Sequence, residues 1–172
     1  MKRYLRYFLA IIIVFFIACS NPKAELQKDI SKMEASPSEF NKAFIDSLTG
    51  KYLKFVEFFP QDSLAPLYLF KAANHLNVTG NYLESIKQFN RLMKDYPNYS
   101  KVPEALFTTA FIYENNLNDL GRAKTLYEEF LKRYPKHELA VSVQFTLNNL
   151  GKSAEEIFNS FPKDSVAAKA IN

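Results

Sequence analysis

The chain of 172 residues has no tryptophan, one cysteine, two histidines and four glycines. Because Cys19 is the only cysteine, the chain can form no intramolecular disulfide and no site built from several thiolates. No HExxH, GxSxG or phosphate-binding glycine loop occurs. The neighbouring acidic pairs Glu128-Glu129 and Glu155-Glu156 would point about 100° apart on a helix, which is typical of a solvated face. These features predict a protein that is not an enzyme and holds no metal or other cofactor.

The charge balance gives no support for a nucleic-acid partner. The chain has 22 basic and 18 acidic side chains, for a net charge of +4. Three of the basic residues, Lys2, Arg3 and Arg6, precede an apolar run, and without them 19 basic side chains stand against 18 acidic ones. A nucleic-acid-binding domain would show a basic stripe or patch, so we expect no nucleic-acid partner.

The first residues have the pattern of an export signal. A basic start is followed by 12 apolar residues from Tyr7 to Ala18, too short a run for a transmembrane helix of about 20 residues. We therefore expect residues 1–18 to be a signal peptide. The sequence Phe16-Ile17-Ala18-Cys19 resembles the lipobox of bacterial lipoproteins, in which leucine is more usual at the place of Phe16.

This resemblance implies cleavage before Cys19, with diacylglycerol on its sulfur and an acyl chain such as palmitate on its new amino group. Several acyl chains make a durable membrane anchor. Ser20 stands where inner-membrane lipoproteins of enteric bacteria have aspartate, so the resemblance favours the outer membrane. The covalent lipid on Cys19 is the only non-protein group that we expect.

One pattern occurs twice between Pro66 and Pro135. In each copy an apolar stripe at helical spacing is followed by a turn and by a second stripe, which ends at Tyr96-Pro97 or Tyr134-Pro135. Self-similarity at a fixed period indicates a solenoid of helix hairpins. The few glycines and the absence of strand-like alternation likewise favour an all-α chain.

The two copies resemble the tetratricopeptide repeat, a helix-turn-helix unit of 34 residues. The second copy matches if its turn, Asn116 to Gly121, holds one extra residue, and coincidental spacing in an ordinary helical bundle is the alternative. Small residues would let the helices of a hairpin approach, and aromatic residues would fill the gap to the next hairpin. The matching positions are Ala73, Gly80, Tyr82, Ser85, Phe89 and Pro97 in the first copy, and Ala110, Tyr113, Ala123, Tyr127 and Pro135 in the second.

The predicted organisation is a signal peptide at 1–18, a lipidated tether at 19–24, a repeat domain at 25–162 and a tail at 163–172. Residues 25–60 would form a degenerate first hairpin, whose second helix starts at a capping box, Ser36-Pro37-Ser38-Glu39. Residues 137–150 and 153–161 would form a last hairpin, with Phe158 at the place of Tyr127. The fold is predicted to be an α-solenoid of about three to three and a half repeats.

In tetratricopeptide proteins the first helices of the repeats line a groove. The positions left over after the packing face is assigned are Phe70, Asn74 and Asn77 in the first copy, and Phe107, Phe111 and Glu114 in the second. Asparagine can donate and accept hydrogen bonds and phenylalanine offers apolar area, so a peptide with aromatic residues would suit this surface. The alternative is that the phenylalanines pack on adjoining hairpins and the asparagines are solvated.

A lipobox, a short tether and repeats that end in Tyr-Pro together resemble BamD-like lipoproteins of the outer membrane. The resemblance implies a periplasm-facing scaffold that helps to assemble β-barrel proteins and binds their aromatic carboxy-terminal signal. This chain has room for fewer repeats than that family has. Two alternatives stay open: a cell-envelope adaptor similar to the Tol-Pal-associated coordinator, and an accessory subunit of another envelope complex.

Three tripeptides, Asp46-Ser47-Leu48, Asp62-Ser63-Leu64 and Asp164-Ser165-Val166, resemble a bacterial O-glycosylation acceptor. Asp-Ser before a helix is also a capping sequence, which we favour for Asp62-Ser63.

Overall fold

The computed structural model describes residues 21–36 and 41–160, and every regular element in these ranges is a helix. The expected all-α class is therefore confirmed. The chain divides into two compact units with the boundary between Asn81 and Tyr82. The predicted signal peptide, Cys19 and the predicted tail lie outside the described residues. Within the described ranges no helix has the length and apolar character needed to cross a membrane.

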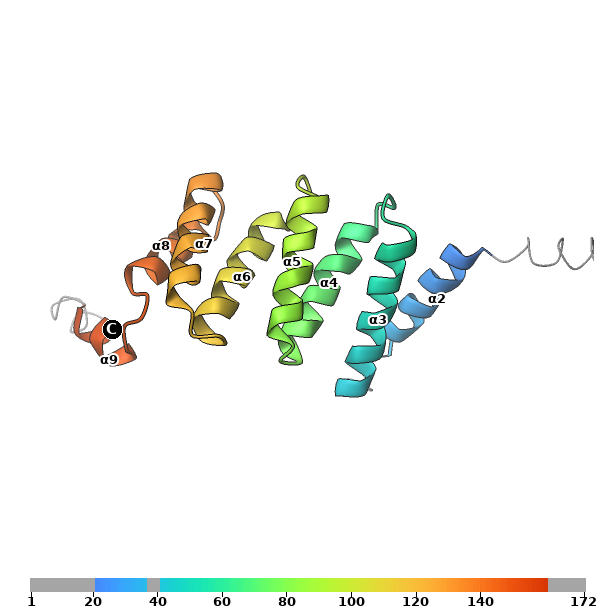
Figure 1. Ribbon diagram of the computed structural model, residues 1–172, viewed down its shortest axis with the longest axis horizontal. Coiled ribbons are helices and arrows are strands. Elements are labelled where there is room, and N and C mark those ends of the chain that lie inside the picture. The colour runs from blue at the N-terminus through green and yellow to red at the C-terminus, as the bar shows by residue number, and fades with distance from the viewer. Residues whose placement is uncertain (1–20, 37–40, 161–172) are drawn as a thin grey trace, which may run out of the picture. The chain divides into compact units, whose positions relative to one another are not determined.

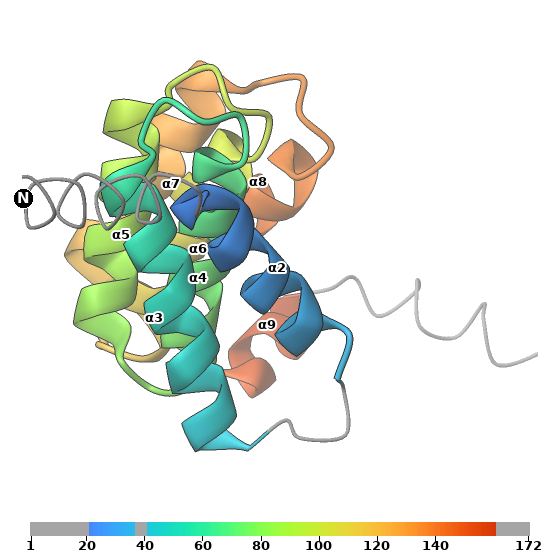
Figure 2. The same cartoon turned by 90° about the vertical axis from the view of Figure 1, so that its right-hand side faces the viewer.

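Unit 1 contains α2 (Pro22–Glu34), α3 (Lys42–Phe58) and α4 (Ala65–Val78). The helix α3 lies beside both α2 and α4, as Figures 1 and 2 show. Its core is aromatic: the Tyr52 ring stacks on Tyr68 at 5.2 Å, and the Phe55 ring meets Tyr68 edge-on at 4.9 Å. All three side chains are buried, so phenylalanine and tyrosine supply the large apolar surface that tryptophan would otherwise give.

The start of α2 corrects the predicted tether. We expected a tether over residues 19–24, but α2 begins at Pro22. Asn21 caps the helix by accepting a hydrogen bond from the amide of Ala24 at 3.2 Å, and Pro22 occupies the first helical position, where its missing N–H costs nothing. Of the predicted tether, only Cys19 and Ser20 precede the cap residue Asn21 in the sequence.

The start of α3 also differs from the prediction. Asn41 is the cap, and its side chain accepts a hydrogen bond from the amide of Phe44 at 2.9 Å. Ser36 instead belongs to the end of α2, where its hydroxyl donates to the carbonyl of Lys32 at 3.1 Å. Residues 37–40 of the predicted capping box lie outside the described residues. The predicted hairpin is present, with a later second helix.

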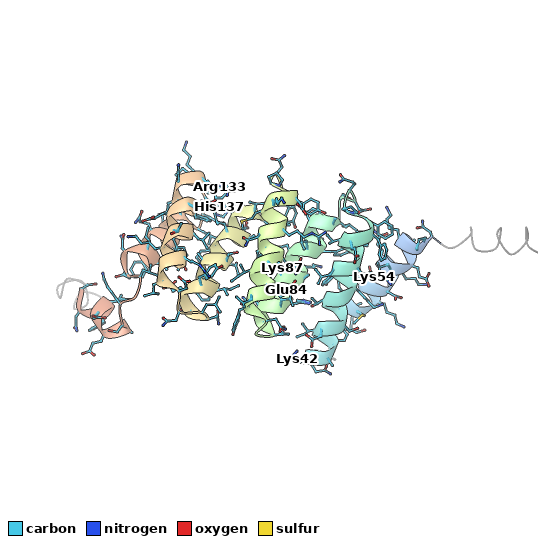
Figure 3. The ribbon with its side chains drawn as sticks, viewed as in Figure 1. Lys42, Lys54, Glu84, Lys87, Arg133 and His137 are labelled. Atoms are coloured by element: carbon cyan, nitrogen blue, oxygen red, sulfur yellow. The ribbon has the colours of Figure 1, made fainter. Side chains whose placement is uncertain are left out.

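Unit 2 contains α5 (Tyr82–Asp95), α6 (Val102–Asn115), α7 (Leu120–Arg133), α8 (Ala140–Asn148) and α9 (Ala154–Ser160). The helices α5 to α8 pack each on the next in chain order. Glu84 and Lys87 form an ion pair at 3.1 Å on α5, where Figure 3 labels them. The core of α6, α7 and α8 consists of Leu106, Ala110, Ala123, Tyr127, Phe130, Ala140 and Val143.

The loops that follow the aromatic-proline pairs have one conformation at three places. In each loop, the residue three positions after the aromatic residue donates its amide to the carbonyl of the aromatic residue. That same residue then accepts, at its own carbonyl, from the amide three positions further on. The distances lie between 2.9 and 3.1 Å. The three series are Phe59, Asp62 and Ala65; Tyr96, Tyr99 and Val102; and Tyr134, His137 and Ala140. The predicted equivalence of Phe59-Pro60 with the two Tyr-Pro pairs is confirmed.

The last hairpin is only partly as predicted. A capping box starts α9: the Ser153 amide donates to the Glu156 carboxylate at 2.6 Å, and the Ser153 hydroxyl accepts from the Glu156 amide at 3.2 Å. The helix has 7 residues and none of them is buried. Phe158, which we expected at the buried place of Tyr127, is 64% exposed. Two turns are too short to reach the core as α7 does. Phe161-Pro162 lies outside the described residues.

Candidate functional site

Three of the predicted groove residues, Phe107, Phe111 and Glu114, lie on one stripe of α6. The Phe107 ring is half-buried, with its centroid 6.1 Å from that of Tyr127 and 6.2 Å from that of Phe111. Phe111 is 44% exposed. Phe107 thus contributes to the packing of α6 on α7, and Phe111 is the accessible apolar group of the stripe.

Glu114 has a partner within the fold. The Tyr127 hydroxyl on α7 donates a hydrogen bond to its carboxylate at 2.7 Å. The Tyr127 ring is fully buried, and a buried hydroxyl needs such a partner. Burial, and then the hydrogen bond to Glu114, raise the pKa of Tyr127, which stays protonated and donating at neutral pH. Glu114 therefore joins the two helices of the hairpin, and a ligand would have to compete for it.

The other predicted groove residues, Phe70, Asn74 and Asn77, lie on α4 in unit 1, and each is half-buried. The Asn74 amide donates to the carbonyl of Phe70, one turn earlier, at 2.9 Å. This bond uses one of the two N–H donors of the Asn74 amide, so one N–H and the amide oxygen could still serve a ligand. The predicted surface thus consists of two stripes, one in each unit.

A second tyrosine-glutamate pair occurs in unit 1. The Tyr52 hydroxyl on α3 donates to the Glu34 carboxylate on α2 at 2.6 Å. We call these two bonds, Tyr52 to Glu34 and Tyr127 to Glu114, the hairpin bridges. Burial, and then Glu34, raise the pKa of Tyr52. Because Tyr52 and Tyr127 occupy the same place in their repeats, the same type of bond recurs in two hairpins.

The bridge in unit 1 extends to α4. Lys71 donates to the Glu34 carboxylate at 2.7 Å, and its ammonium lies 5.8 Å from the centroid of the Tyr52 ring. Burial raises the pKa of Glu34, but the hydrogen bonds from Lys71 and then Tyr52 outweigh it, and the net shift is downward. The carboxylate on α2 is therefore ionised at neutral pH and contacts both α3 and α4.

His75 completes this cluster. Its Nδ1 atom lies 3.2 Å from the Thr49 hydroxyl, which donates its own proton to the carbonyl of Ile45 at 2.7 Å. In the tautomer that leaves the Thr49 proton on the Ile45 carbonyl, the imidazole donates from Nδ1 to the hydroxyl. Burial, and then the charge of Lys71, lower the pKa of His75, so the ring is neutral at pH 7. The cluster holds helices together and offers no activated nucleophile.

The residues that define the repeats lie where a hairpin would use them. The small residues Ala73, Ala110 and Ala123 are fully buried, as are Phe89 and Tyr127. Gly80 has φ of +81°, a left-handed conformation that favours glycine in the turn. The remaining positions are Tyr82 and Tyr113, which are half-buried, and Pro97 and Pro135, which are exposed after the helix ends.

The acidic pairs serve local structure. Glu129 accepts a hydrogen bond from Arg133 one turn later at 2.7 Å, and Glu156 belongs to the cap of α9. Among the described residues no three histidine, cysteine or acidic side chains gather as metal ligands. His137 accepts a hydrogen bond from the amide of Leu139 at 3.2 Å, in the loop after α7. Figure 3 labels Arg133, the last residue of α7, and His137 in the loop that follows.

The three Asp-Ser tripeptides lie in different kinds of structure. Asp62 accepts a hydrogen bond from the amide of Leu64 at 2.9 Å, in the turn before α4. The cap residue of α4 is Leu64 and no side chain caps this helix, so the capping role that we favoured for Asp62-Ser63 is wrong. Ser47 lies within α3 and its side chain is exposed. The third tripeptide, 164–166, lies outside the described residues.

Comparison with known proteins identifies the repeat. A family model of the tetratricopeptide repeat matches residues 104–137, which hold most of α6, all of α7 and the loop that follows. No curated protein matches the chain. The chain therefore contains a tetratricopeptide repeat within an all-α, solenoid-type fold. Such repeats are scaffolds for binding other proteins, which indicates a protein-interaction role.

Proposed function

We propose that this protein is a non-enzymatic scaffold lipoprotein of the outer membrane, facing the periplasm, that contributes to the assembly of β-barrel proteins as BamD-like lipoproteins do. Its partners would be other envelope proteins, including a barrel-assembly complex and unfolded outer-membrane proteins. The anchor would be the lipid on Cys19. The basic start, the 12 apolar residues and the Ala18-Cys19 junction support this part of the proposal.

The observation that carries the binding part is the exposed aromatic surface of α6. Phe111 is 44% exposed on a first helix of the matched repeat, with the ring of Phe107 at 6.2 Å. Aromatic rings at this separation offer edges and faces to a further ring, and such pairs contribute about 0.5–1.5 kcal/mol beyond the area they bury. The aromatic carboxy-terminal signal that the BamD resemblance implies has the matching chemistry.

Mild detergent extraction of the tagged, lipidated protein from its own outer membrane, followed by mass spectrometry, tests the assignment. We expect enrichment of a large β-barrel protein with periplasmic repeat domains. Recovery of peptidoglycan-associated proteins would instead support the Tol-Pal-type adaptor. Recovery of neither group, with another envelope complex in its place, would refute the barrel-assembly role.

A variant pair tests the surface itself. Phe111→Ser removes the exposed ring and should abolish binding of a peptide that ends in aromatic residues, with little change in urea unfolding. Val141→Ser is the matched control, because Val141 is 81% exposed on α8 of the same unit. Equal binding by the two variants would exclude the α6 surface. Phe107→Ser is less informative, because Phe107 also packs against Tyr127.

A further inference from the structure

One end of unit 1 brings the first turn of α2 and the last turn of α3 together. The Lys23 ammonium on α2 lies 2.8 Å from the carboxylate of Asp62, just after α3. Between the two helices an open groove of about 790 Å³ extends from Pro22 along α3 to Phe58 and Phe59. We call the first turn of α2, the last turn of α3 and Asp62 together the Phe58 end.

The Phe58 end presents apolar surface to solvent. Phe58 is 61% exposed on the last turn of α3, and Phe59 and Leu26 line the same groove. The Lys54 ammonium, one turn earlier, lies 6.0 Å from the centroid of the Phe58 ring. Figure 3 shows Lys54 on α3, well away from Lys42 in its first turn. An aromatic ring beside a long basic side chain is a pairing suited to a membrane interface.

The chain before α2 fixes which end of the unit would face a lipid anchor. Asn21 is the helix cap, so only Ser20 stands between it and Cys19. At no more than about 3.6 Å per residue, two residue steps of chain span at most roughly 7 Å. The headgroup layer on each side of a bilayer is itself about 5–8 Å thick. A lipid on Cys19 would therefore hold the Phe58 end at the headgroups.

We propose that the Phe58 end is a membrane-contact surface, in which the Phe58 ring enters the interface of the bilayer and the Lys54 ammonium remains among the phosphates. This inference rests on the proposed lipid anchor and specifies how the folded unit sits on the membrane. It commits unit 1 to an orientation in which α2 and α3 reach the bilayer by their Phe58 end.

The charges at this end define the kind of contact. Lys23, Lys51 and Lys54 lie on this part of unit 1 together with Glu25, Asp29, Glu57 and Asp62. Lys28 and Lys32 also lie near enough to help lower the pKa of Asp29, so the two signs of charge are close to balance. Lys51 pairs with Asp29 at 2.7 Å, and Lys23 pairs with Asp62. With this balance the end gains little from attraction to anionic lipid. Insertion of one ring is weak by itself, so the contact depends on the high local concentration that the anchor supplies, and salt should change it little.

The absence of tryptophan allows a direct test. Phe58→Trp gives the full-length, lipidated protein a single indole at the proposed contact. Val78→Trp is the matched control: Val78 is 76% exposed at the last residue of α4, a 14-residue helix that runs away from the Phe58 end for about 20 Å. Each variant is reconstituted into phosphatidylethanolamine-phosphatidylglycerol vesicles, with and without lipids brominated near the headgroup end of the acyl chains.

We expect brominated lipid to quench the emission of F58W and to leave that of V78W unchanged, and this difference should persist in 0.5 M salt, where the Debye length falls to a few ångström. Quenching of both variants, or of neither, would overturn the proposed orientation. Flotation of the wild-type protein with vesicles, compared with Cys19→Ser, tests the anchor separately. If Cys19→Ser floats as the wild type does, the anchor and this inference are refuted together. If flotation depends on Cys19 but quenching is not selective for F58W, the inference alone is refuted.

Discussion

Removal of the Tyr127 hydroxyl is the sharpest test of the hairpin bridges. Tyr127→Phe keeps the ring in the core of unit 2, where it packs near Phe107, and deletes only the donor to Glu114. No cavity forms, because the substitution removes a single oxygen. Any loss of stability therefore reports the hydrogen bond to the carboxylate.

The expected magnitude follows from the burial of the two partners. A hydrogen bond to a charged group contributes about 1.5–3 kcal/mol to the free energy of unfolding. Glu114 is only half-buried, so water can replace the lost donor and limit the cost. We therefore expect Tyr127→Phe to lower the free energy of unfolding by about 1.5–2 kcal/mol. Glu114→Gln, which keeps a neutral acceptor, should cost about 0.5–1.5 kcal/mol.

Urea unfolding of the two single variants and the double variant completes the cycle. If the hydroxyl and the carboxylate interact, Glu114→Gln should cost much less in the Tyr127→Phe background than alone. Hydrogen exchange locates the effect, with faster exchange expected in α6 and α7 and no change in α2 and α3. Equal costs of Glu114→Gln in both backgrounds would refute the bridge and return Glu114 to the groove.

Four further predictions concern the other bridge, His75 and two glycines. Because the folded state raises the pKa of Tyr52 above its ordinary value of 10.0, its stabilisation is complete below that pH and is lost progressively as the pH rises above it. Tyr52→Phe should therefore flatten the fall in urea stability above pH 10. The pKa of His75 is lowered below 6.5, so stability present above pH 6.5 is lost as pH falls, and His75→Gln should remove this acid sensitivity. In thermal unfolding, Gly50→Ala within α3 should raise the free energy of unfolding by about 1 kcal/mol, because alanine favours the helix and the added Cβ would meet nothing within 4 Å. Gly151→Ala should destabilise by about 1–2 kcal/mol, because its φ is +77° and its Cβ would lie 3.0 Å from Leu120.

The features predictable from the sequence are those set by short stretches of chain. The aromatic-proline stop is an example, since the hydrogen bonds from Asp62 to Phe59 and from His137 to Tyr134 span three residues each. Gly80 is another, because its φ of +81° is a property of one turn. Local signals of this kind, repeated at a fixed period, were sufficient to predict the helix hairpins.

Competition between local signals explains the wrong helix start. Ser36 and Asn41 are both good helix caps, and a capping-box pattern favoured the serine. In the fold the Asn41 side chain accepts from the Phe44 amide, whereas the Ser36 hydroxyl donates to a carbonyl of the preceding helix.

The hairpin bridges were missed because they join residues on different helices, yet the repeats held a signal for them. Tyrosine stands at Tyr52 and Tyr127, and a glutamate lies near the end of the preceding helix in both cases. A search for polar pairs that recur at equivalent places in the repeats would have found them. Glu114 would then have been assigned to the hairpin before the groove was considered.

The repeat that ends at Pro97 has no hairpin bridge, and its polar groove residue is therefore available for binding. Counted in the same register, its residues at the tyrosine and glutamate places are Phe89 and Asn77, so both members of the pair change together. A glutamate that served only a ligand would have no reason to vary with a buried tyrosine of its own hairpin. With no hydroxyl on Phe89, the polar group at position 77 is not required for a bridge, and an amide that both donates and accepts is suited to a peptide backbone. Among the predicted polar groove residues, Asn77 is therefore a better candidate for ligand contact than Glu114.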